Sequence, residues 1–175
     1  MNTSSLRIYT LLNAAVFSAA LALVLNYASG HYHRKGLDLK GVVNYAGTAE
    51  LKPITGPVDR AALELYLSYD LRDAFDWNTN TIFLYVTANY ETAKHHRNEL
   101  IIHDKIIRRR EDAFEPGASI LGKYYMVDHG RSLRKTPVTL RMYYSVVPLG
   151  GFIETYQLAE SRFVMPQDYV VPTPS

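Results

Sequence analysis

The 175-residue chain contains no cysteine. This absence excludes disulfide bonds, thiolate nucleophiles and any zinc or iron–sulfur site built on cysteine ligands. It does not identify the cellular compartment, because disulfides are needed mainly where the hydrophobic core is too small to stabilise a secreted domain. A chain of this length can bury one sizeable core, so we expect one globular domain.

Sequence motifs that build common catalytic sites are also absent. The chain has no G-x-S-x-G or H-E-x-x-H motif and no complete phosphate-binding glycine loop. Ser119 or Ser161 could be combined with a distant histidine, but nothing in their spacing favours such a pair. A membrane-anchored hydrolase that uses an unrecognised Ser–His pair is therefore the weakest of the three functional hypotheses that we consider; the other two are given below. We predict no catalytic residue and no cofactor.

An excess of charge of one sign is missing as well. The 19 Lys and Arg residues and 17 Asp and Glu residues leave a net charge of +2 at pH 7. A nucleic-acid-binding domain carries a clear basic excess, so no nucleic-acid partner is predicted. The basic run Arg108–Arg110 is followed at once by Glu111 and Asp112, and we interpret it as a solvated loop rather than a site for lipid headgroups.

Three histidines lie close together in the sequence, namely His95, His96 and His103. Adjacent histidines on a strand point to opposite faces, so His95 and His96 can bind one metal ion together only from a loop. We favour the simpler interpretation of a solvated polar connection and predict no metal site.

Charge is wholly absent from the long apolar stretch at residues 8–27. At ~1.5 Å per residue, a helix of this length spans the roughly 30 Å hydrocarbon layer of a bilayer. Tyr9 and Tyr27 lie near its two ends, where aromatic rings favour the headgroup zone. We therefore predict a short N-terminal segment at residues 1–7, a transmembrane helix at residues 8–27 and a juxtamembrane linker at residues 28–36.

A cleaved signal peptide is the alternative interpretation of this segment. Arg7 supplies a thin basic start, and Ala28 and Gly30 are small residues at the positions that a cleavage site requires. The apolar stretch is longer than the usual ~7–15 residues of a signal peptide, which favours an uncleaved anchor. The orientation stays open on charge alone, because Arg7 and the α-amino group roughly balance Arg34 and Lys35.

Small and polar side chains recur every four residues within the span. Ala14, Ser18, Ala22 and Asn26 share one face of the predicted helix. Such a face lets a second transmembrane helix approach closely. Chance spacing in a segment rich in alanine and leucine explains the pattern equally well, so the helix partner is an open hypothesis.

The remaining chain lacks a helical pattern and instead shows the two-residue period of β-strands. Apolar residues alternate with other residues along 63–71 and 138–147. The run at residues 81–90 is apolar on both faces in its first half, which predicts a central strand covered on two sides. Further strands are predicted at residues 37–47, 99–108, 123–128 and 154–165, with turns at residues 55–57, 115–117 and 128–130. We therefore predict a mainly β fold, in which residues 37–175 form an antiparallel β-sandwich-like domain after a single N-terminal transmembrane helix.

Six short motifs follow one another along this predicted domain. They are Thr55-Gly56-Pro57, Asp70-Leu71 with Phe75-Asp76-Trp77-Asn78, Phe83-Leu84-Tyr85, Asp104-Lys105-Ile106, Val138-Thr139-Leu140 and Ser145-Val146-Val147-Pro148, and Pro166 and Tyr169 close the series. In order and spacing, these motifs resemble the subunit 3 family of the eukaryotic signal peptidase complex. The resemblance covers nearly the whole chain, and the D-W-N motif before an F-L-Y strand is its most specific part.

This resemblance implies a non-catalytic accessory subunit that binds and supports the catalytic subunit during removal of signal peptides from proteins entering the endoplasmic reticulum. It implies a single-pass type II protein of that membrane, in contact with lipid and with other accessory subunits. Residues 1–7 are then cytosolic, and the C-terminal β-rich domain, residues 37–175, is lumenal. The serine and histidine chemistry of cleavage then belongs to the separate catalytic subunit. The residues carried over as structural or interface positions are Asp76, Trp77, Asn78, Phe83, Tyr85, Asp104, Lys105, Val147 and Pro148.

Two positions depart from the family pattern. Members commonly carry an N-V-T glycosylation sequon before the V-T-L strand, whereas this chain has Pro137 there, so glycosylation is not predicted at that site. His103 stands where relatives show tryptophan, and no shared role is carried over to that side chain.

Trp77 is the only tryptophan of the chain, and it lies among turn-forming residues directly before the predicted central strand. Asp and Asn side chains bond the backbone of tight turns, so we interpret Trp77 as a packed peg that fixes the turn. An exposed anchor for the catalytic subunit is the alternative. A membrane-anchored β-sandwich that binds an unrelated protein ligand remains the second functional hypothesis.

Overall fold

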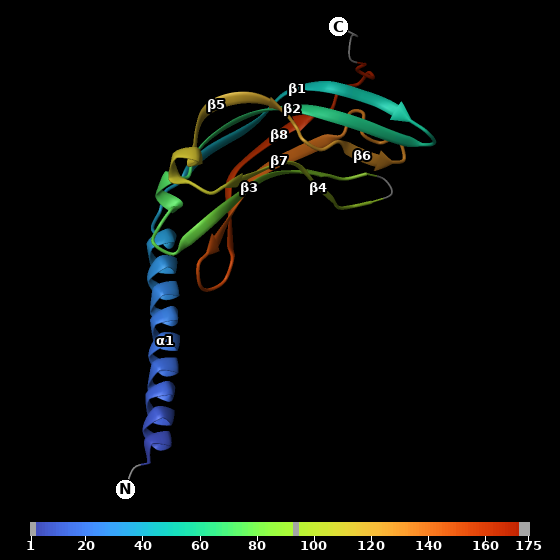
Figure 1. Ribbon diagram of the computed structural model, residues 1–175. Helices are drawn as coiled ribbons and strands as arrows, with labels where there is room; N and C mark the ends of the chain where they lie inside the picture. Colours follow the sequence, from blue (N-terminus) through green and yellow to red (C-terminus); the bar gives the residue numbers. More distant parts are fainter. Residues whose placement is uncertain (1–2, 93–94, 172–175) are drawn as a thin grey trace.

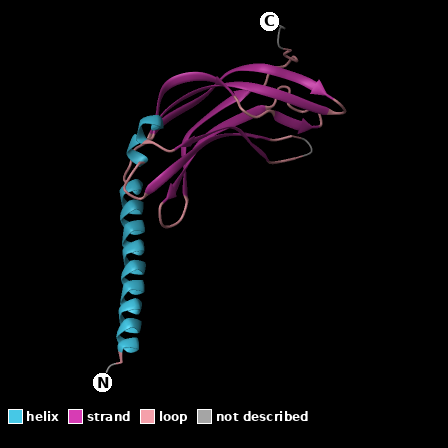
Figure 2. Cartoon of the chain, viewed as in Figure 1, coloured by secondary structure: helices cyan, strands magenta, loops and turns pink. Residues whose placement is uncertain are grey.

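The computed structural model describes residues 3–92 and 95–171. One long helix, α1 (Ser4–Lys35), extends away from a domain built from two antiparallel β-sheets (Figure 1 and Figure 2). One hydrophobic core includes buried residues of both sheets, as in a sandwich. The predicted mainly β fold with a single N-terminal apolar helix is confirmed.

Helix α1 follows from a composition rich in alanine and leucine, which favour helices. It ends before Gly36, and the basic residues Arg34 and Lys35 of its last turn stabilise the negative end of the helix dipole. The helix is long and apolar enough to cross a membrane. The linker expected at residues 28–36 is instead helical as far as Lys35, because side chains of this part bond to the β domain.

The first sheet contains four strands. Their bounds are β1 (Lys40–Ile54), β2 (Val58–Asp70), β5 (Phe114–Leu121) and β6 (Met126–His129). Strand β2 pairs with β1 on one side, and on the other side with β6 near its start and with β5 near its end. The turn predicted at residues 55–57 joins β1 to β2, and Gly56 supplies the positive φ of 80° there. Strand β6 begins only at Met126, later than the strand expected at residues 123–128.

The second sheet has the order β4-β3-β7-β8, and all its pairs are antiparallel. Its strands are β4 (Asn98–Ile107), β3 (Thr79–Tyr90), β7 (Pro137–Pro148) and β8 (Glu154–Val164). Two short 3-10 helices, η1 (Arg72–Ala74) and η2 (Arg110–Ala113), connect one sheet to the other. Both lie close to the C-terminal end of α1 in Figure 1.

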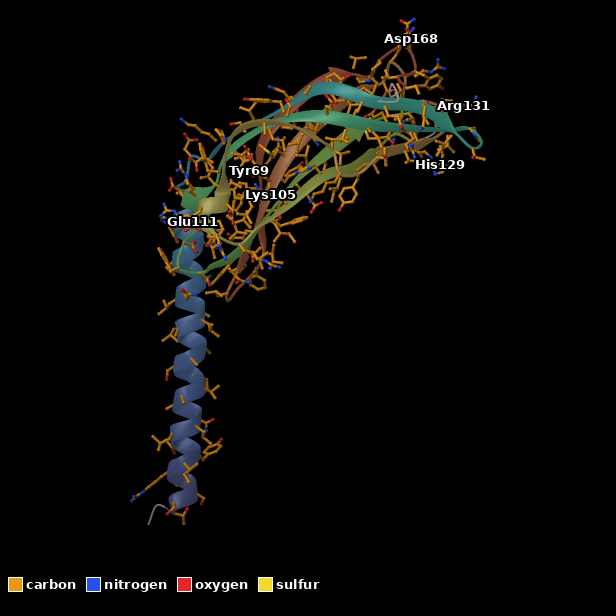
Figure 3. The ribbon with its side chains drawn as sticks, turned by 45° about the horizontal axis from the view of Figure 1, so that its top comes forward. Tyr69, Lys105, Glu111, His129, Arg131 and Asp168 are labelled. Carbon is orange, nitrogen blue, oxygen red and sulfur yellow. The ribbon has the colours of Figure 1, made fainter. Side chains whose placement is uncertain are left out.

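The hydrophobic core is formed by alternate residues of the long strands, because every second residue of a strand faces inward. Buried rows come from β2 and its end (Leu63, Leu65, Leu67, Tyr69 and Leu71), from β3 (Ile82, Leu84, Val86, Ala88 and Tyr90) and from β7 (Val138, Leu140, Met142, Tyr144 and Val146). The inward faces predicted for residues 63–71 and 138–147 are thus confirmed. Lys105 on β4 donates a hydrogen bond from Nζ to the Tyr69 hydroxyl at 2.7 Å, across the two sheets (Figure 3).

The outer face of the second sheet differs from the prediction. Strand β3 is central in its sheet, but Phe83 and Tyr85 on its outer face are only half-buried. The Tyr85 ring stacks on Phe83 and on Tyr143, with centroids 5.3 and 5.4 Å apart. The expectation of a strand covered on two sides is therefore wrong, because stacked rings rather than a further layer shield this face.

Strand β5 contains the Glu115-Pro116-Gly117 segment for which the sequence predicts a turn. The pairing of β5 with β2 shifts register at this point, which marks a β-bulge. Proline is tolerated here because the unpaired residue of a bulge does not have to donate a backbone hydrogen bond. Gly117 has a φ of 143°, and the Tyr66 side chain occupies the space where a side chain of residue 117 would project. The turn predicted at residues 115–117 is therefore the interior of a strand.

A candidate functional site at the junction of helix and β domain

The C-terminal turns of α1 contact two loops of the β domain (Figure 1). One loop carries Asp76, Trp77 and Asn78 between η1 and β3. The other is the β7–β8 loop, residues 149–153, which leads into Glu154. We call the contacts among these three segments the junction.

Arg34 is the charged centre of the junction. Its side chain is only 2% exposed, and it forms ion pairs from Nη1 to Asp76 Oδ2 at 2.6 Å and from Nε to Glu154 Oε2 at 3.2 Å. Burial alone lowers the pKa of Arg34, but the charge of Asp76 and the hydrogen bond to Glu154 outweigh burial and raise the pKa. A guanidinium presents donors in several directions from one rigid plane, so this residue ties α1 both to the loop that carries Asp76 and to the start of β8.

Glu154, the first residue of β8, accepts hydrogen bonds from several side chains. Its Oε1 accepts hydrogen bonds from the Tyr27 hydroxyl at 3.0 Å and from His31 Nδ1 at 2.5 Å. Its Oε2 accepts a bond from the Tyr156 hydroxyl at 2.8 Å. Burial raises the pKa of Glu154, yet these hydrogen bonds and the one from Arg34 outweigh burial and lower the pKa to about 2. The carboxylate therefore stays ionised at neutral pH.

Asn78 joins all three segments through its buried amide group. Its Oδ1 accepts hydrogen bonds from Asn26 Nδ2 at 2.8 Å and from the Gly150 N–H at 3.1 Å. Its Nδ2 donates to the Gly150 carbonyl at 2.9 Å. Asp76 shapes the turn that presents Asn78, because its Oδ1 accepts bonds from the Asn78 N–H and the Thr79 hydroxyl, both at 2.8 Å. A buried amide with this many partners fixes the helix against the loop.

Trp77 does not fill the core, contrary to the interpretation favoured from the sequence. It is 58% exposed. The indole Nε1 donates a 3.3 Å hydrogen bond to the Ser29 hydroxyl, and the ring lies 5.5 Å from the His33 ring, both on α1. Its neighbours Asp76 and Asn78 take the inward positions and form the buried bonds. These two residues, rather than the indole, therefore fix the turn.

The face of small residues predicted within the span reaches the junction at its last member. Asn26 bonds Asn78, and the four-residue spacing continues through Gly30 and Arg34. A methyl group on Gly30 would lie 3.2 Å from Arg34 Nη1 and 3.4 Å from Asp76 Oδ2, so the helix runs close to this ion pair at Gly30. The other members are exposed on α1, namely Ala14, Ser18 and Ala22. A helix partner for them stays a prediction.

Val147 and Pro148 lie at the edge of the junction. They end β7 directly before the β7–β8 loop, and they pair with Thr81 and Thr79 at the start of β3. This pairing places the loop beside the turn at residues 76–78.

The other motif residues lie farther along the sandwich. Phe83 and Tyr85 belong to the stacked rings on the outer face of the second sheet. Asp104 and Lys105 lie on β4, where Asp104 forms a 3.4 Å ion pair with Lys123. The structure keeps these motif residues apart from the junction, and a role for them in an interface stays a prediction.

Sequence reasoning missed Arg34, Glu154, Tyr27 and His31 as site residues. Charge counting treats Arg34 only as a signal of membrane orientation, but residues 27, 31 and 34 share one helix face at spacings of four and three. Extending the helical pattern beyond residue 27 would have grouped them. No comparable signal marks Glu154, whose bonds to the helix span 120 to 127 positions of the chain.

The junction connects segments of the chain. The serine and histidine residues considered from the sequence for catalysis or metal binding, namely Ser119, Ser161, His95, His96 and His103, do not belong to it. Within residues 3–92 and 95–171, no group of three His, Cys, Asp or Glu side chains is placed to hold a metal ion. His95 and His96 are exposed in the β3–β4 connection. Ser161 lies on β8 and His103 on β4, at opposite edges of one sheet, and Ser119 lies in the other sheet.

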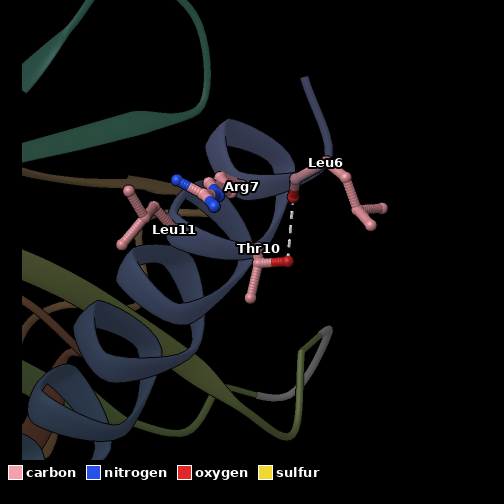
Figure 4. Close-up of a pocket in the computed structure, with 4 residues that line it drawn as sticks. All are labelled: Leu6, Arg7, Thr10 and Leu11. Atoms are coloured by element: carbon pink, nitrogen blue, oxygen red, sulfur yellow. Dashed lines mark hydrogen bonds between the residues drawn. The ribbon is translucent and has the colours of Figure 1, made fainter. Parts of the chain in front are cut away.

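A depression near the start of α1 lies among Leu6, Arg7, Thr10 and Leu11 (Figure 4). The Thr10 hydroxyl donates a 2.9 Å hydrogen bond to the Leu6 carbonyl, which satisfies this polar group on an apolar helix. Only residues of the helix itself line the depression, so we expect lipid to fill it when α1 spans a membrane.

Comparisons with known proteins find relatives along nearly the whole chain. The family described as "Signal peptidase subunit" matches residues 1–168. "Signal peptidase complex subunit 3" of Caenorhabditis briggsae is 30% identical over 168 residues, which cover 93% of this chain and 89% of the relative. The protein of the same name from Dictyostelium discoideum is 31% identical over 108 residues, which cover 62% of this chain and 63% of the relative. Among solved structures, a putative ApaA protein of Bordetella pertussis covers 75% of this chain and 96% of its own with 13% identity and a TM-score of 0.35, which is too low to support a conclusion.

Proposed function

This chain belongs to the signal peptidase subunit family, and from this membership we propose that it is a non-catalytic subunit that binds and supports the catalytic subunit of a signal peptidase complex. Its relatives carry the name of a third subunit, so further accessory subunits are expected in the same complex. In this proposal the chain is a single-pass type II protein of the endoplasmic reticulum membrane. Its N-terminus is cytosolic, its β domain is lumenal, and α1 is retained as an anchor.

The junction is the structural observation that supports this role. Two largely buried ion pairs and a buried amide network hold the sandwich against one end of α1. A signal peptide presents a short apolar segment followed by its cleavage site, so the cut is made close to the membrane. A β domain fixed at the membrane surface offers a stable support to a catalytic subunit that works at that level.

Purification through a tag on this chain tests the assembly. Mild-detergent extraction of microsomes is expected to recover a serine peptidase subunit together with the tagged chain. The variant Asp76→Ala with Asn78→Ala is expected to lower that recovery, because it removes a partner of Arg34 and the amide that bonds the β7–β8 loop. Recovery of the unaltered chain without any peptidase subunit contradicts the proposal.

The non-catalytic role has a separate test. Ser119→Ala, Ser161→Ala and His103→Ala are each expected to leave signal-peptide cleavage near normal once activity is normalised to intact complex. The reason is that a serine nucleophile needs a base within about 3 Å. The fold places His103 and Ser161 at opposite edges of one sheet and Ser119 in the other sheet. A complete complex that loses cleavage through one of these substitutions assigns chemistry to this chain and refutes the non-catalytic role.

Topology and retention of α1 are tested on sealed microsomes. The β domain is expected to resist protease until detergent is added, and digestion without detergent contradicts the lumenal placement. N-terminal sequencing of the mature chain decides whether α1 is retained. A mature chain that begins at His31 contradicts retention.

A further inference from the structure

The β7–β8 loop, residues 149–153, exposes a concentrated apolar surface. Leu149, Phe152 and Ile153 are 70%, 75% and 64% exposed. The loop contains no charged residue, and its other two residues are glycines. Soluble proteins rarely expose contiguous apolar patches larger than a few hundred Å², and larger patches mark contacts with a membrane or with another protein.

The loop lies beside the membrane span rather than beyond its end. Figure 1 shows it as the part of the β domain that reaches farthest toward the N-terminal end of α1. The Phe152 ring meets the Tyr27 ring edge to face with centroids 5.7 Å apart, and a methyl group on Gly150 would lie 3.2 Å from Leu23 Cδ2. Leu23 precedes Tyr27 by about one helical turn, roughly 6 Å along the axis. The loop therefore reaches about one turn below the end of the apolar span, residues 8–27.

The loop is held at this level by buried bonds. The Asn78 side chain bonds both the N–H and the carbonyl of Gly150, and the Leu149 N–H donates to the Asn78 carbonyl at 2.7 Å. Gly151 takes a φ of 123°, with the Tyr27 ring where a side chain would project. The loop is thus pinned to the turn on one side and to α1 on the other.

Charge near the loop does not oppose contact with lipid. Glu154 follows the loop directly, but its side chain is only 13% exposed and pairs with Arg34 at 3.2 Å. Tyr27 presents an aromatic body with a polar tip, which suits the boundary between headgroups and acyl chains. No free charge has to be carried into the bilayer with Phe152 and its apolar neighbours.

We propose that the β7–β8 loop inserts into the lipid bilayer beside α1, at the boundary between the headgroups and the acyl chains. Amphipathic helices that lie in a membrane interface bury their apolar face roughly 5–10 Å deep. This depth agrees with a loop that reaches one helical turn below the end of the span. The helix and the loop then form two attachments to the same leaflet. Together they fix the tilt of the β domain relative to the bilayer as well as its distance from the membrane surface. The inference rests on the membrane span of α1, not on the identity of the subunit that the chain binds.

Single-cysteine spin labelling tests this insertion on a chain that has no cysteine of its own. Full-length variants Phe152→Cys, Leu21→Cys and Ile54→Cys each carry one nitroxide and are reconstituted into phosphatidylcholine vesicles. Leu21 lies in the span and Ile54 lies at the β1–β2 turn, and they are 60% and 36% exposed, so neither substitution removes a core side chain. Molecular oxygen concentrates in lipid, whereas a water-soluble nickel chelate stays outside it. Each accelerates the spin relaxation of a nitroxide that it can reach, so the two relaxation rates report whether a label lies in lipid or in water.

The label at position 152 is expected to respond as the label at position 21 does, with strong relaxation by oxygen and little by nickel. The label at position 54 is expected to show the reverse. A position 152 label that follows position 54 overturns the proposal, and so does a position 21 label that is open to nickel, because the span would then be wrong. In vesicles that contain the assembled complex, loss of both oxygen and nickel relaxation at position 152 assigns the loop to a protein partner and also overturns the proposal.

Discussion

Arg34 holds the junction together because its side chain reaches two carboxylates at once, rather than because its ion pairs add much stability. A buried ion pair gives little net stability, because the cost of removing charges from water offsets most of their attraction. The value of Arg34 lies in its position, since one side chain satisfies Asp76 and Glu154 together. Removing a single partner is far more costly than replacing the whole group, because it leaves a charge unpaired in a buried site.

We therefore expect Arg34→Met to destabilise the junction by roughly 3–5 kcal/mol. The substitution leaves Asp76, whose side chain is 0% exposed, without a counter-charge. Faster hydrogen exchange at the backbone amides of residues 28–35, measured on the full chain in nanodiscs, is the expected result. Arg72→Met is the matched control, because the Arg72–Asp70 pair is exposed and such pairs contribute at most about 1 kcal/mol. Equal effects of the two substitutions would show that Arg34 does not hold the junction.

The junction is expected to resist mild acid and to weaken only at low pH. The pKa of Glu154 is about 2 in the folded chain, against its ordinary value of 4.5. A carboxylate with a lowered pKa contributes stability that is complete above the ordinary value and is lost as pH falls through the folded value. The contribution of Glu154 should therefore persist down to about pH 4.5 and decline from there toward about pH 2.

Trp77 fluorescence can measure this pH dependence, because the only tryptophan of the chain contacts Ser29 and His33 on α1. The two proteins compared, one with Glu154 and one with Glu154→Gln, both carry His33→Gln, so that the imidazole ring beside the indole is absent from each. The emission change below about pH 4.5 is expected to be smaller in Glu154→Gln than in the protein that keeps Glu154, since glutamine does not titrate. Identical changes in the two proteins would assign the low-pH transition to other carboxylates.

At the residue scale, the sequence identifies the turn at 76–78 but not its contacts. Aspartate and asparagine around Trp77 indicate a tight turn by their own chemistry. The same pattern holds whether the indole points inward or outward, and the structure turns it outward. Arg34 contacts Asp76 across 42 positions of the chain, and no local pattern encodes such a pair.

At the element scale, strands with two different faces could be predicted and elements that depend on distant partners could not. Residues 63–71 and 138–147 alternate cleanly, and the structure buries the predicted face of each. Strand β5 contains Pro116 and Gly117, which indicate a turn locally, and it exists because β2 pairs with it across a bulge. The last turns of α1 stay helical beyond the apolar span because the β domain bonds them.

The β7–β8 loop supports α1 through Gly151, and Gly151→Ala is expected to loosen the helix there. An added methyl group would overlap the Tyr27 ring at a residue whose φ is 123°. Gly56→Ala is the matched control, because Gly56 has a φ of 80° but no atom within 4 Å of an added methyl group, which leaves backbone strain of roughly 1–3 kcal/mol alone. Hydrogen exchange at residues 28–35 should rise in Gly151→Ala and stay unchanged in Gly56→Ala. A rise in both variants would point to general destabilisation of the sandwich.

At the scale of the whole molecule, a β-sandwich is carried on a membrane helix by two kinds of connection. The covalent connection is short, since only residues 36–39 separate α1 from β1. The second connection is the junction, which bonds the helix to the loop at residues 76–78 and to Glu154 at the start of β8. Either connection alone could set the orientation of the sandwich, and the two can be separated by experiment.

We expect the junction, rather than the short covalent link, to set this orientation. Inserting about six Gly and Ser residues after Gly36 raises the cost of loop closure by only about 1 kcal/mol. The insertion leaves the bonds of Arg34 and Asn78 in place. Distances between nitroxides at Leu21→Cys and Leu121→Cys, which are exposed positions on α1 and β5, report the orientation in vesicles by pulsed electron spin resonance.

The distance distribution is expected to be narrow both in the unaltered chain and in the chain with the insertion, because the same buried bonds hold the sandwich in both. Adding Asp76→Ala and Asn78→Ala to the insertion removes those bonds and should broaden the distribution, since a flexible link of about ten residues allows many orientations. The two alanine substitutions without the insertion are the control for a direct effect on the sandwich itself. Broadening of the distance distribution by the insertion alone would mean that the covalent link sets the orientation of the sandwich and that the bonds of the junction are not sufficient to do so.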